Sequence, residues 1–295
     1  MRVLKPFDYF EAATVKEAAQ FLTTHGGKAQ VLAGGVDLIP RMRRGKKEAD
    51  CLVNIQKIPG LETIEATGAN GLKFGAMATL HSLETSKAIQ DDYPILYEAI
   101  HQISSVQAKY MGTAVGNLCV ATPASDVATA LFALGAELTI EGADGERKES
   151  MEKFYVDYGR TSLQKNEIVT EVFLPRPPAG TGTAFMNLVR THADIAKVSI
   201  AVAITVKDGV CEKARIAVGA AAPTVFRAKK AEAALNGQKV TPEAIHEAAE
   251  TAAGETKPIT DLRSTAEYRR KMTGVLAGRA MEKALKQADL YMSIV

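Results

Sequence analysis

The segment Gln30-Val31-Leu32-Ala33-Gly34-Gly35-Val36-Asp37-Leu38 decides how the first part of the chain folds. Its first residues are mostly apolar and predict a short strand, which the paired glycines Gly34 and Gly35 terminate. Because glycine has no Cβ, two of them in succession let backbone N–H groups come close to a phosphate. The alternative is an ordinary turn between a strand and a helix, and the segment taken alone favours that alternative.

The elements on either side of this turn predict a small α/β unit. A capping box at Thr14-Val15-Lys16-Glu17 begins a helix that the glycines at 26 and 27 end. Another short strand is expected at 51–55. Strands that alternate with a helix in this way indicate one α/β unit over residues 1–55.

The rest of the chain divides at the proline-rich segment 175–180. Before it, the pattern predicts strands at 72–75, 137–141 and 167–174, and helices at 94–104 and from Ser125 or Asp126 onward. After it, strands are expected at 184–189, 198–206 and 210–218, followed by helices that begin at Thr241-Pro242 and at the capping box 264–267. Strands followed by helices predict an α+β domain with an antiparallel sheet.

Charge and composition exclude several classes of partner. The 36 basic and 34 acidic residues give a net charge of +2, which is too balanced for a nucleic-acid-binding surface. No apolar run approaches the roughly 20 residues of a spanning helix, so membrane insertion is not expected. The beginning of the sequence shows no apolar signal region, and we therefore expect a cytoplasmic protein. The three cysteines stand far apart and cannot supply the four thiolates of an all-cysteine iron–sulfur cluster.

Two further motifs carry candidate chemistry. The first is an expected loop at 112–117, Gly-Thr-Ala-Val-Gly-Asn, followed by Thr122-Pro123-Ala124-Ser125-Asp126 at a helix start. Its ordinary interpretation is a turn with a helix cap. The second is the segment 190–198, which runs from Arg190 to Val198, and its ordinary interpretation is a surface ion pair at a strand entry. Neither glycine motif has the lysine that a nucleoside triphosphate site normally uses, so a diphosphate held by backbone amides fits better.

In this order, the three motifs resemble those of the FAD-binding medium subunit of the xanthine dehydrogenase and carbon monoxide dehydrogenase family. That family shows A-G-G-T-D-L, then G-T-[IV]-G-G-N-[IL] with S-P-x-x-D, then R-x-x-x-D-I-A-x-V. The segment 219–224 is also similar to the family's G-x-x-A-x-x-P element. This sequence departs from the family twice, with Val36 in place of a threonine and Val115 in place of a glycine.

The resemblance implies an α+β fold with a two-subdomain FAD-binding domain of the vanillyl-alcohol-oxidase (PCMH) type. That domain would cover residues 1–176, with subdomains at about 1–55 and 56–176, and a C-terminal domain of the CO dehydrogenase flavoprotein type would cover 180–288. By the same resemblance, Leu32 would contact a noncovalent FAD, and backbone amides of Ala33, Gly34, Gly35, Val36, Asp37 and Leu38 would hold its pyrophosphate. The second wall would be formed by Thr113, Gly116 and Asn117, and Asp126 would accept from a ribitol or ribose hydroxyl. Ile195 would lie against the isoalloxazine ring with Asp194 beside it, and Ile103 and Val169 would pack on the cofactor.

The implied function is electron transfer within a larger enzyme. A small partner subunit with two [2Fe–2S] clusters would pass electrons to FAD on this chain, and a large subunit would hold the molybdenum cofactor. The assembly would be a heterotrimer, with its further dimerisation left open. Two alternatives remain at this point: a self-sufficient flavin oxidase of the same fold, for which His192 is the candidate for covalent attachment, and a nucleotide-sensing or scaffold module that has lost flavin. Substrate and electron acceptor are not encoded in any motif of this chain.

Overall fold

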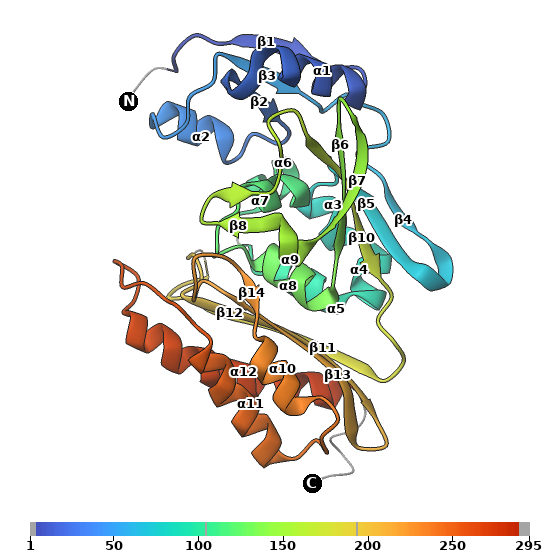
Figure 1. The fold of residues 1–295 in the computed structure, drawn as a ribbon, viewed down its shortest axis with the longest axis vertical. Helices are drawn as coiled ribbons and strands as arrows, with labels where there is room; N and C mark the ends of the chain where they lie inside the picture. The colour runs from blue at the N-terminus through green and yellow to red at the C-terminus, as the bar shows by residue number, and fades with distance from the viewer. Residues whose placement is uncertain (1–3, 104, 193, 289–295) are drawn as a thin grey trace.

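The computed structural model describes residues 4–103, 105–192 and 194–288. Three units follow one another along the long axis of the molecule (Figure 1), each built around its own β-sheet. The first two share one continuous hydrophobic core, to which a few side chains of the third unit also belong, and the third has a further core of its own. No helix in the described part of the chain is long and apolar enough to cross a membrane.

The N-terminal unit contains a three-stranded parallel sheet with the strand order β1-β3-β2. Its elements are β1 (Asp8–Glu11), α1 (Val15–His25), a 3₁₀ turn (Gly26–Lys28), β2 (Ala29–Leu32), α2 (Leu38–Arg43) and β3 (Cys51–Asn54). The predicted capping box is confirmed, because the Thr14 side chain accepts a hydrogen bond from the backbone N–H of Glu17. Strand β1 was not predicted, since most of its side chains are exposed and its sequence does not alternate.

The middle unit is built on a five-stranded antiparallel sheet with the order β4-β5-β10-β6-β7. The strands are β4 (Ile64–Ala66), β5 (Gly71–Gly75), β6 (Glu137–Gly142), β7 (Gly145–Ser150) and β10 (Ile168–Pro175), with a small β8–β9 hairpin (Tyr155–Asp157, Arg160–Thr161). The helices are α3 (Leu80–Thr85), α4 (Lys87–Asp92), α5 (Pro94–His101), α6 (Val106–Met111), α7 (Ala114–Cys119), α8 (Asp126–Leu134) and α9 (Met151–Phe154). The predicted helix at 94–104 ends at His101, and Ser104 lies outside the described residues.

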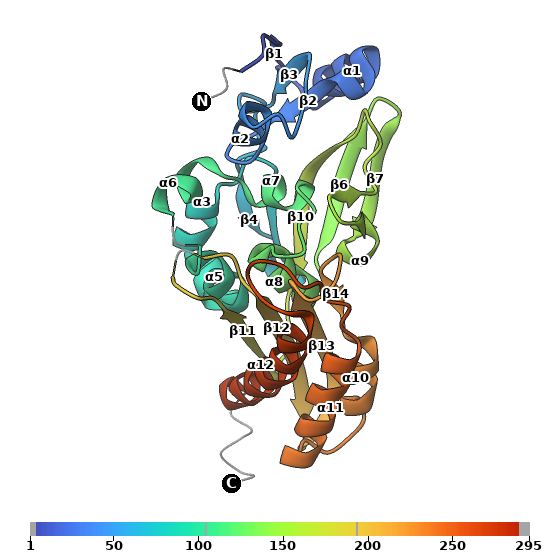
Figure 2. The ribbon, with the colours of Figure 1, turned by 90° about the vertical axis from the view of Figure 1, so that its left-hand side faces the viewer.

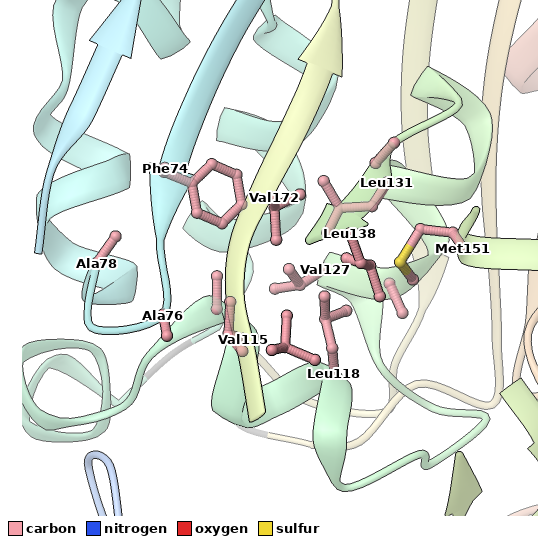
Figure 3. Packing of buried hydrophobic residues seen from close by; sticks show 14 of the residues in the cluster. Phe74, Ala76, Ala78, Val115, Leu118, Val127, Leu131, Leu138, Met151 and Val172 are labelled. Atoms are coloured by element: carbon pink, nitrogen blue, oxygen red, sulfur yellow. The ribbon is translucent and has the colours of Figure 1, made fainter. Parts of the chain in front are cut away.

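Packing between this sheet and helices α7 and α8 fixes the beginnings of both helices. Figure 3 shows Phe74 and Val172 on the sheet close to Val115, Leu118 and Val127 on the helices. Burial of such apolar side chains contributes roughly 1.5–3 kcal/mol for each large residue. The core therefore holds rigidly the two helix starts at which the candidate residues Thr113 and Asp126 stand.

The C-terminal unit has the predicted antiparallel sheet followed by helices. The strands β11 (Thr181–Leu188), β12 (Val198–Lys207), β13 (Val210–Gly219) and β14 (Phe226–Arg227) pair in that order. Helices α10 (Lys229–Leu235), α11 (Pro242–Gly254) and α12 (Ala266–Gln287) cover one face of the sheet (Figure 2). On its other face, β12 and β13 contact helix α8 of the middle unit, so β12 is buried along all of its length except Lys207.

Further details of the sequence prediction need correction, and two of them are instructive. The segment 112–117, expected to be a loop, contains the first turns of helix α7 from Ala114 onward. Helix α10 was not predicted at all. Both helices are short, at six and seven residues, and their apolar pattern covers too few turns to stand out from the sequence.

Candidate functional site

The glycine turn after β2 lies directly against the turn that precedes α7. A Cβ placed on Gly34 would stand 1.8 Å from the carbonyl oxygen of Met111, so only glycine fits there. Gly35 has a φ of +69°, a left-handed conformation that favours glycine. The two glycine motifs, which are far apart in the sequence, are thus in contact. The sequence predicts that a phosphate comes close to Gly34. In the structure, the group that lies close to Gly34 is the backbone carbonyl group of Met111.

Additional hydrogen bonds hold this first turn in place. The side-chain amide of Gln56 donates a hydrogen bond to the carbonyl oxygen of Ala33 at 2.6 Å. The backbone N–H of Ile39 donates to the carbonyl oxygen of Gly35 at 3.2 Å. Asp37 pairs with Arg41 one turn later at 2.7 Å, on the exposed side of α2. Val36, where the family has threonine, leaves 43% of its surface exposed. Gln56 was missed at the sequence level because its role depends on the pairing of β2 with β3.

The second motif forms a capped helix start. Thr113 is buried, and its hydroxyl accepts from the backbone N–H of Gly116 at 2.9 Å. The side-chain oxygen of Asn117 accepts from the hydroxyl of Ser125, which also caps helix α8. The Val115 side chain lies in the hydrophobic core (Figure 3), so this departure from the family pattern places no side chain on the outer face of the turn.

Asp126 stands where the middle and C-terminal units meet. Its Oδ2 accepts from the side-chain amide of Asn187 on β11 at 3.1 Å. Its Oδ1 is buried and has no hydrogen-bond partner among the described residues. Burial raises the pKa of this carboxyl group to about 6, against the opposing interactions with the side chains of Asn187 and Ser199. A buried acceptor without a partner is costly, and a hydroxyl group of a bound ligand would satisfy it.

The third motif forms the loop between β11 and β12. The side chain of Asp194 accepts from the backbone N–H of Ile195 at 2.9 Å and lies 3.5 Å from Arg190. The surface ion pair of the ordinary interpretation is therefore present. The same loop also exposes 49% of the apolar Ile195 side chain. Ala193 of this motif lies outside the described residues.

Some of the candidate residues have little free surface, and Thr113, for example, exposes only 2% of its area. Val169 on β10 exposes only 2% of its area and belongs to the hydrophobic core. Ile103 is half-buried and packs against the same core. A ligand could therefore touch only a small part of Val169, whereas the turn at 33–38 offers backbone groups and the exposed side chains of Val36 and Asp37, and the turn at 112–117 offers partly exposed residues at both ends.

Asn187, which was missed at the sequence level, also belongs to this region, as does the turn at 219–220 within the segment that resembles the family's G-x-x-A-x-x-P element. The backbone N–H of Ala220 donates to the carbonyl oxygen of Pro123 at 2.7 Å, three residues before Asp126. Ala220 has a φ of +59°, which is strained for a residue with a Cβ. Asn187 could not be found from the sequence because its role arises only from its contact with Asp126 in another unit.

The arrangement suits a dinucleotide cofactor. Two converging backbone turns without a lysine fit a diphosphate, the free Asp126 oxygen fits a sugar-type hydroxyl, and Ile195 offers an apolar surface to a ring. The fold and these residues together define a nucleotide-cofactor protein of the flavoprotein class.

Comparison with known proteins gives the particular family. Residues 5–177 match the FAD binding domain in molybdopterin dehydrogenase, and residues 183–284 match the CO dehydrogenase flavoprotein C-terminal domain. The carbon monoxide dehydrogenase medium chain of Afipia carboxidovorans is 34% identical, over 96% of this chain and 98% of that one. Subunit alpha of the 6-hydroxypseudooxynicotine dehydrogenase complex of Paenarthrobacter nicotinovorans is 32% identical, over 97% of each.

A solved structure agrees with these relatives. Carbon monoxide dehydrogenase from Hydrogenophaga pseudoflava matches with a TM-score of 0.93 and 34% identity, over 96% of this chain and 98% of that one. The chain belongs to the family of FAD-binding medium subunits of molybdenum-dependent dehydrogenases. The predicted family and fold class are confirmed, and the self-sufficient oxidase is disfavoured.

Proposed function

We propose that this chain binds one noncovalent FAD at the junction of its three units and relays electrons through it. The diphosphate would lie against backbone N–H groups of 32–38 and against Thr113, Gly116 and Asn117. Asp126 would accept from a sugar-type hydroxyl, while Asp194 and Ile195 would face the flavin ring. Ile103 and Val169 would contribute at most a small contact. The observation that carries this proposal is the unpartnered, buried Oδ1 of Asp126, which directly follows Ser125, the hydrogen-bond partner of Asn117 in the second turn.

The proposed partners are a large subunit with the molybdenum cofactor and a small subunit with two [2Fe–2S] clusters, in a heterotrimer. Support comes from relatives whose names mark them as a medium chain and as one subunit of a complex, and which match over nearly their whole length. Bound flavin accepts and releases electrons singly or in pairs, so it can join one-electron clusters to a two-electron acceptor. The protein's own residues would hold and orient the flavin, and substrate choice would belong to the large subunit.

We also propose a cytoplasmic location. The three cysteines, Cys51, Cys119 and Cys211, are all free thiols in the structure, as is usual in a reducing compartment.

Reconstitution tests the relay function. The purified chain loaded with FAD should not oxidise aldehydes, purines, carbon monoxide or N-heterocycles, and it should reduce dyes with NADH only if NAD is its natural acceptor. Adding the large and small subunits should give substrate-dependent reduction of the bound flavin, seen as bleaching of its visible absorption. Steady turnover of an organic substrate by this chain alone would contradict the relay function. A colourless protein that takes up no FAD would instead support the scaffold alternative.

A further inference from the structure

Arg269 on helix α12 is a buried cation that contacts neither glycine turn. Only 3% of its surface is exposed. One terminal nitrogen of its guanidinium group donates to the carbonyl oxygens of Lys197 at 2.7 Å and of Ala220 at 2.9 Å, and the other donates to Asp261 at 2.8 Å. Such charge-assisted bonds are stronger than neutral ones.

The two carbonyl groups belong to segments that lead directly to the proposed flavin site. Lys197 closes the loop that carries Asp194 and Ile195, and its own N–H donates to Leu188 across the base of that loop. Ala220 holds Pro123 through a hydrogen bond of 2.7 Å, and Pro123 lies three residues before Asp126. Arg269 therefore joins the two segments from behind.

Asp261 in turn fixes the guanidinium group. Its Oδ1 also accepts from the backbone N–H groups of Arg263 at 2.8 Å and Ser264 at 3.2 Å. Burial raises the pKa of Asp261, but the hydrogen bonds from the backbone N–H of Arg263 and from Arg269 outweigh this effect and hold the pKa below its ordinary value. The lowered pKa favours the ionised form of Asp261, and its hydrogen bond holds the guanidinium group of Arg269 in one position.

We propose that Arg269 is a positioning residue for the flavin: it sets the spacing between the Asp194–Ile195 loop and the turn that leads to Asp126. This inference rests on the proposed FAD site. The planar guanidinium fork reaches two carbonyl groups and a carboxylate at once, whereas a lysine ammonium is a point charge on a flexible stem. Lysine at this position would preserve the charge but lose the spacing.

The test compares R269K with R270K, a matched control at the neighbouring exposed position. Three quantities are measured: the FAD dissociation constant, the thermal midpoint of the FAD-free protein, and the visible spectrum and midpoint potential of the bound flavin. We expect R269K to bind FAD about tenfold more weakly, with an altered spectrum and potential of the bound flavin and a thermal midpoint lowered by the loss of buried charge-assisted hydrogen bonds. R270K should match the wild type throughout.

Two results would overturn the proposal. One is wild-type affinity, spectrum and potential in R269K. The other is a lower thermal midpoint with an unchanged spectrum of the flavin that remains, because that would show a structural role only. If R269K does not fold, D261N carries the test and should shift the same quantities in the same direction by less. If D126N loses FAD affinity and R269K does not, the proposed FAD site is supported but the role of Arg269 is refuted. If the wild-type protein does not bind FAD, the proposed FAD site itself is refuted.

Discussion

The two sides of the proposed site are built in different ways. The glycine turn at 33–38 is a local structure whose fit depends on backbone atoms, since Gly34 meets the Met111 carbonyl group and Gly35 adopts a left-handed φ. The Asp126 side is assembled from three separate elements, with Asn187 on β11 and the Ala220–Pro123 bond across the unit boundary. The first side should therefore be sensitive to shape and indifferent to pH, and the second should respond to pH.

The largest effect is expected from G34A. The added Cβ would stand 1.8 Å from the Met111 oxygen, so the two glycine turns must separate, at a cost of about 3 kcal/mol in the free energy of unfolding. FAD affinity should fall by about a hundredfold or more because both walls of the site move. Urea unfolding and FAD titration measure the two effects.

G27A is the matched control for this substitution. A Cβ on Gly27 would meet only the Lys165 side chain at ordinary contact distances, so its stability and FAD affinity should stay near those of the wild type. If G34A behaved like G27A, direct contact between the two turns would not be a feature of the protein.

D126N addresses the titratable side. The pKa of Asp126 in the folded protein is raised to about 6. The stabilisation linked to its protonation is therefore fully present at pH values below the pKa of the unfolded chain, and it is lost as the pH rises through about 6. Without FAD, D126N should therefore be about 1–3 kcal/mol more stable than the wild type near pH 8, and this gain should vanish near pH 4. FAD affinity should fall by about tenfold, because one acceptor oxygen is replaced by a donor.

Denaturation curves across this pH range, with and without FAD, check this prediction. Parallel pH profiles for the wild type and D126N would show that the carboxyl group is not penalised by burial. G34A should show no comparable pH dependence of its own, which separates the two sides of the site.

E152Q probes the same unit boundary away from the flavin site. Glu152 of α9 pairs with Arg227 at 2.6 Å and Lys229 at 2.9 Å in the C-terminal unit. Although burial raises it, the pKa of Glu152 is lowered to about 2 by hydrogen bonds from Lys229 and Arg227. The ionised Glu152 stabilises the folded protein at pH values above the pKa that this group has in the unfolded chain, and this stabilisation is lost as the pH falls toward about 2.

We expect E152Q to lose about 1–2 kcal/mol of unfolding free energy at neutral pH, after allowance for solvent screening. The loss should shrink progressively below about pH 4.5, and FAD affinity should change little. A large loss of FAD from E152Q would show that the whole unit boundary, rather than the Asp126 side alone, controls binding.

The smallest effect is expected at Gly35. Its φ of +69° penalises a residue with a Cβ by about 1 kcal/mol. Because asparagine tolerates this conformation better than alanine, G35N should be less destabilised than G35A. Thermal midpoints of the two variants compare them, and equal losses would indicate that the space next to Leu32, rather than the backbone angle, limits this position.

The order of elements and the glycine motifs could be predicted from the sequence because their signals are local. Capping residues such as Thr14 and Ser125 mark helix starts, and apolar runs on either side of the turn Asp208-Gly209 mark the long strands β12 and β13. Asn187 and Arg269 could not be predicted, since each acts through a contact with an element distant in the sequence. The contact of Gly34 with Met111 is of the same kind, because the glycine is conspicuous but its neighbour is not.

The most direct test of the central claim is an equilibrium titration of the FAD-free chain with FAD and, separately, with FMN. A site made of two converging backbone turns for a diphosphate, with Asp126 beside them, should bind one FAD per chain and bind FMN much more weakly, because FMN lacks the diphosphate. Equal affinities for FAD and FMN, or no saturable binding of FAD, would contradict the account.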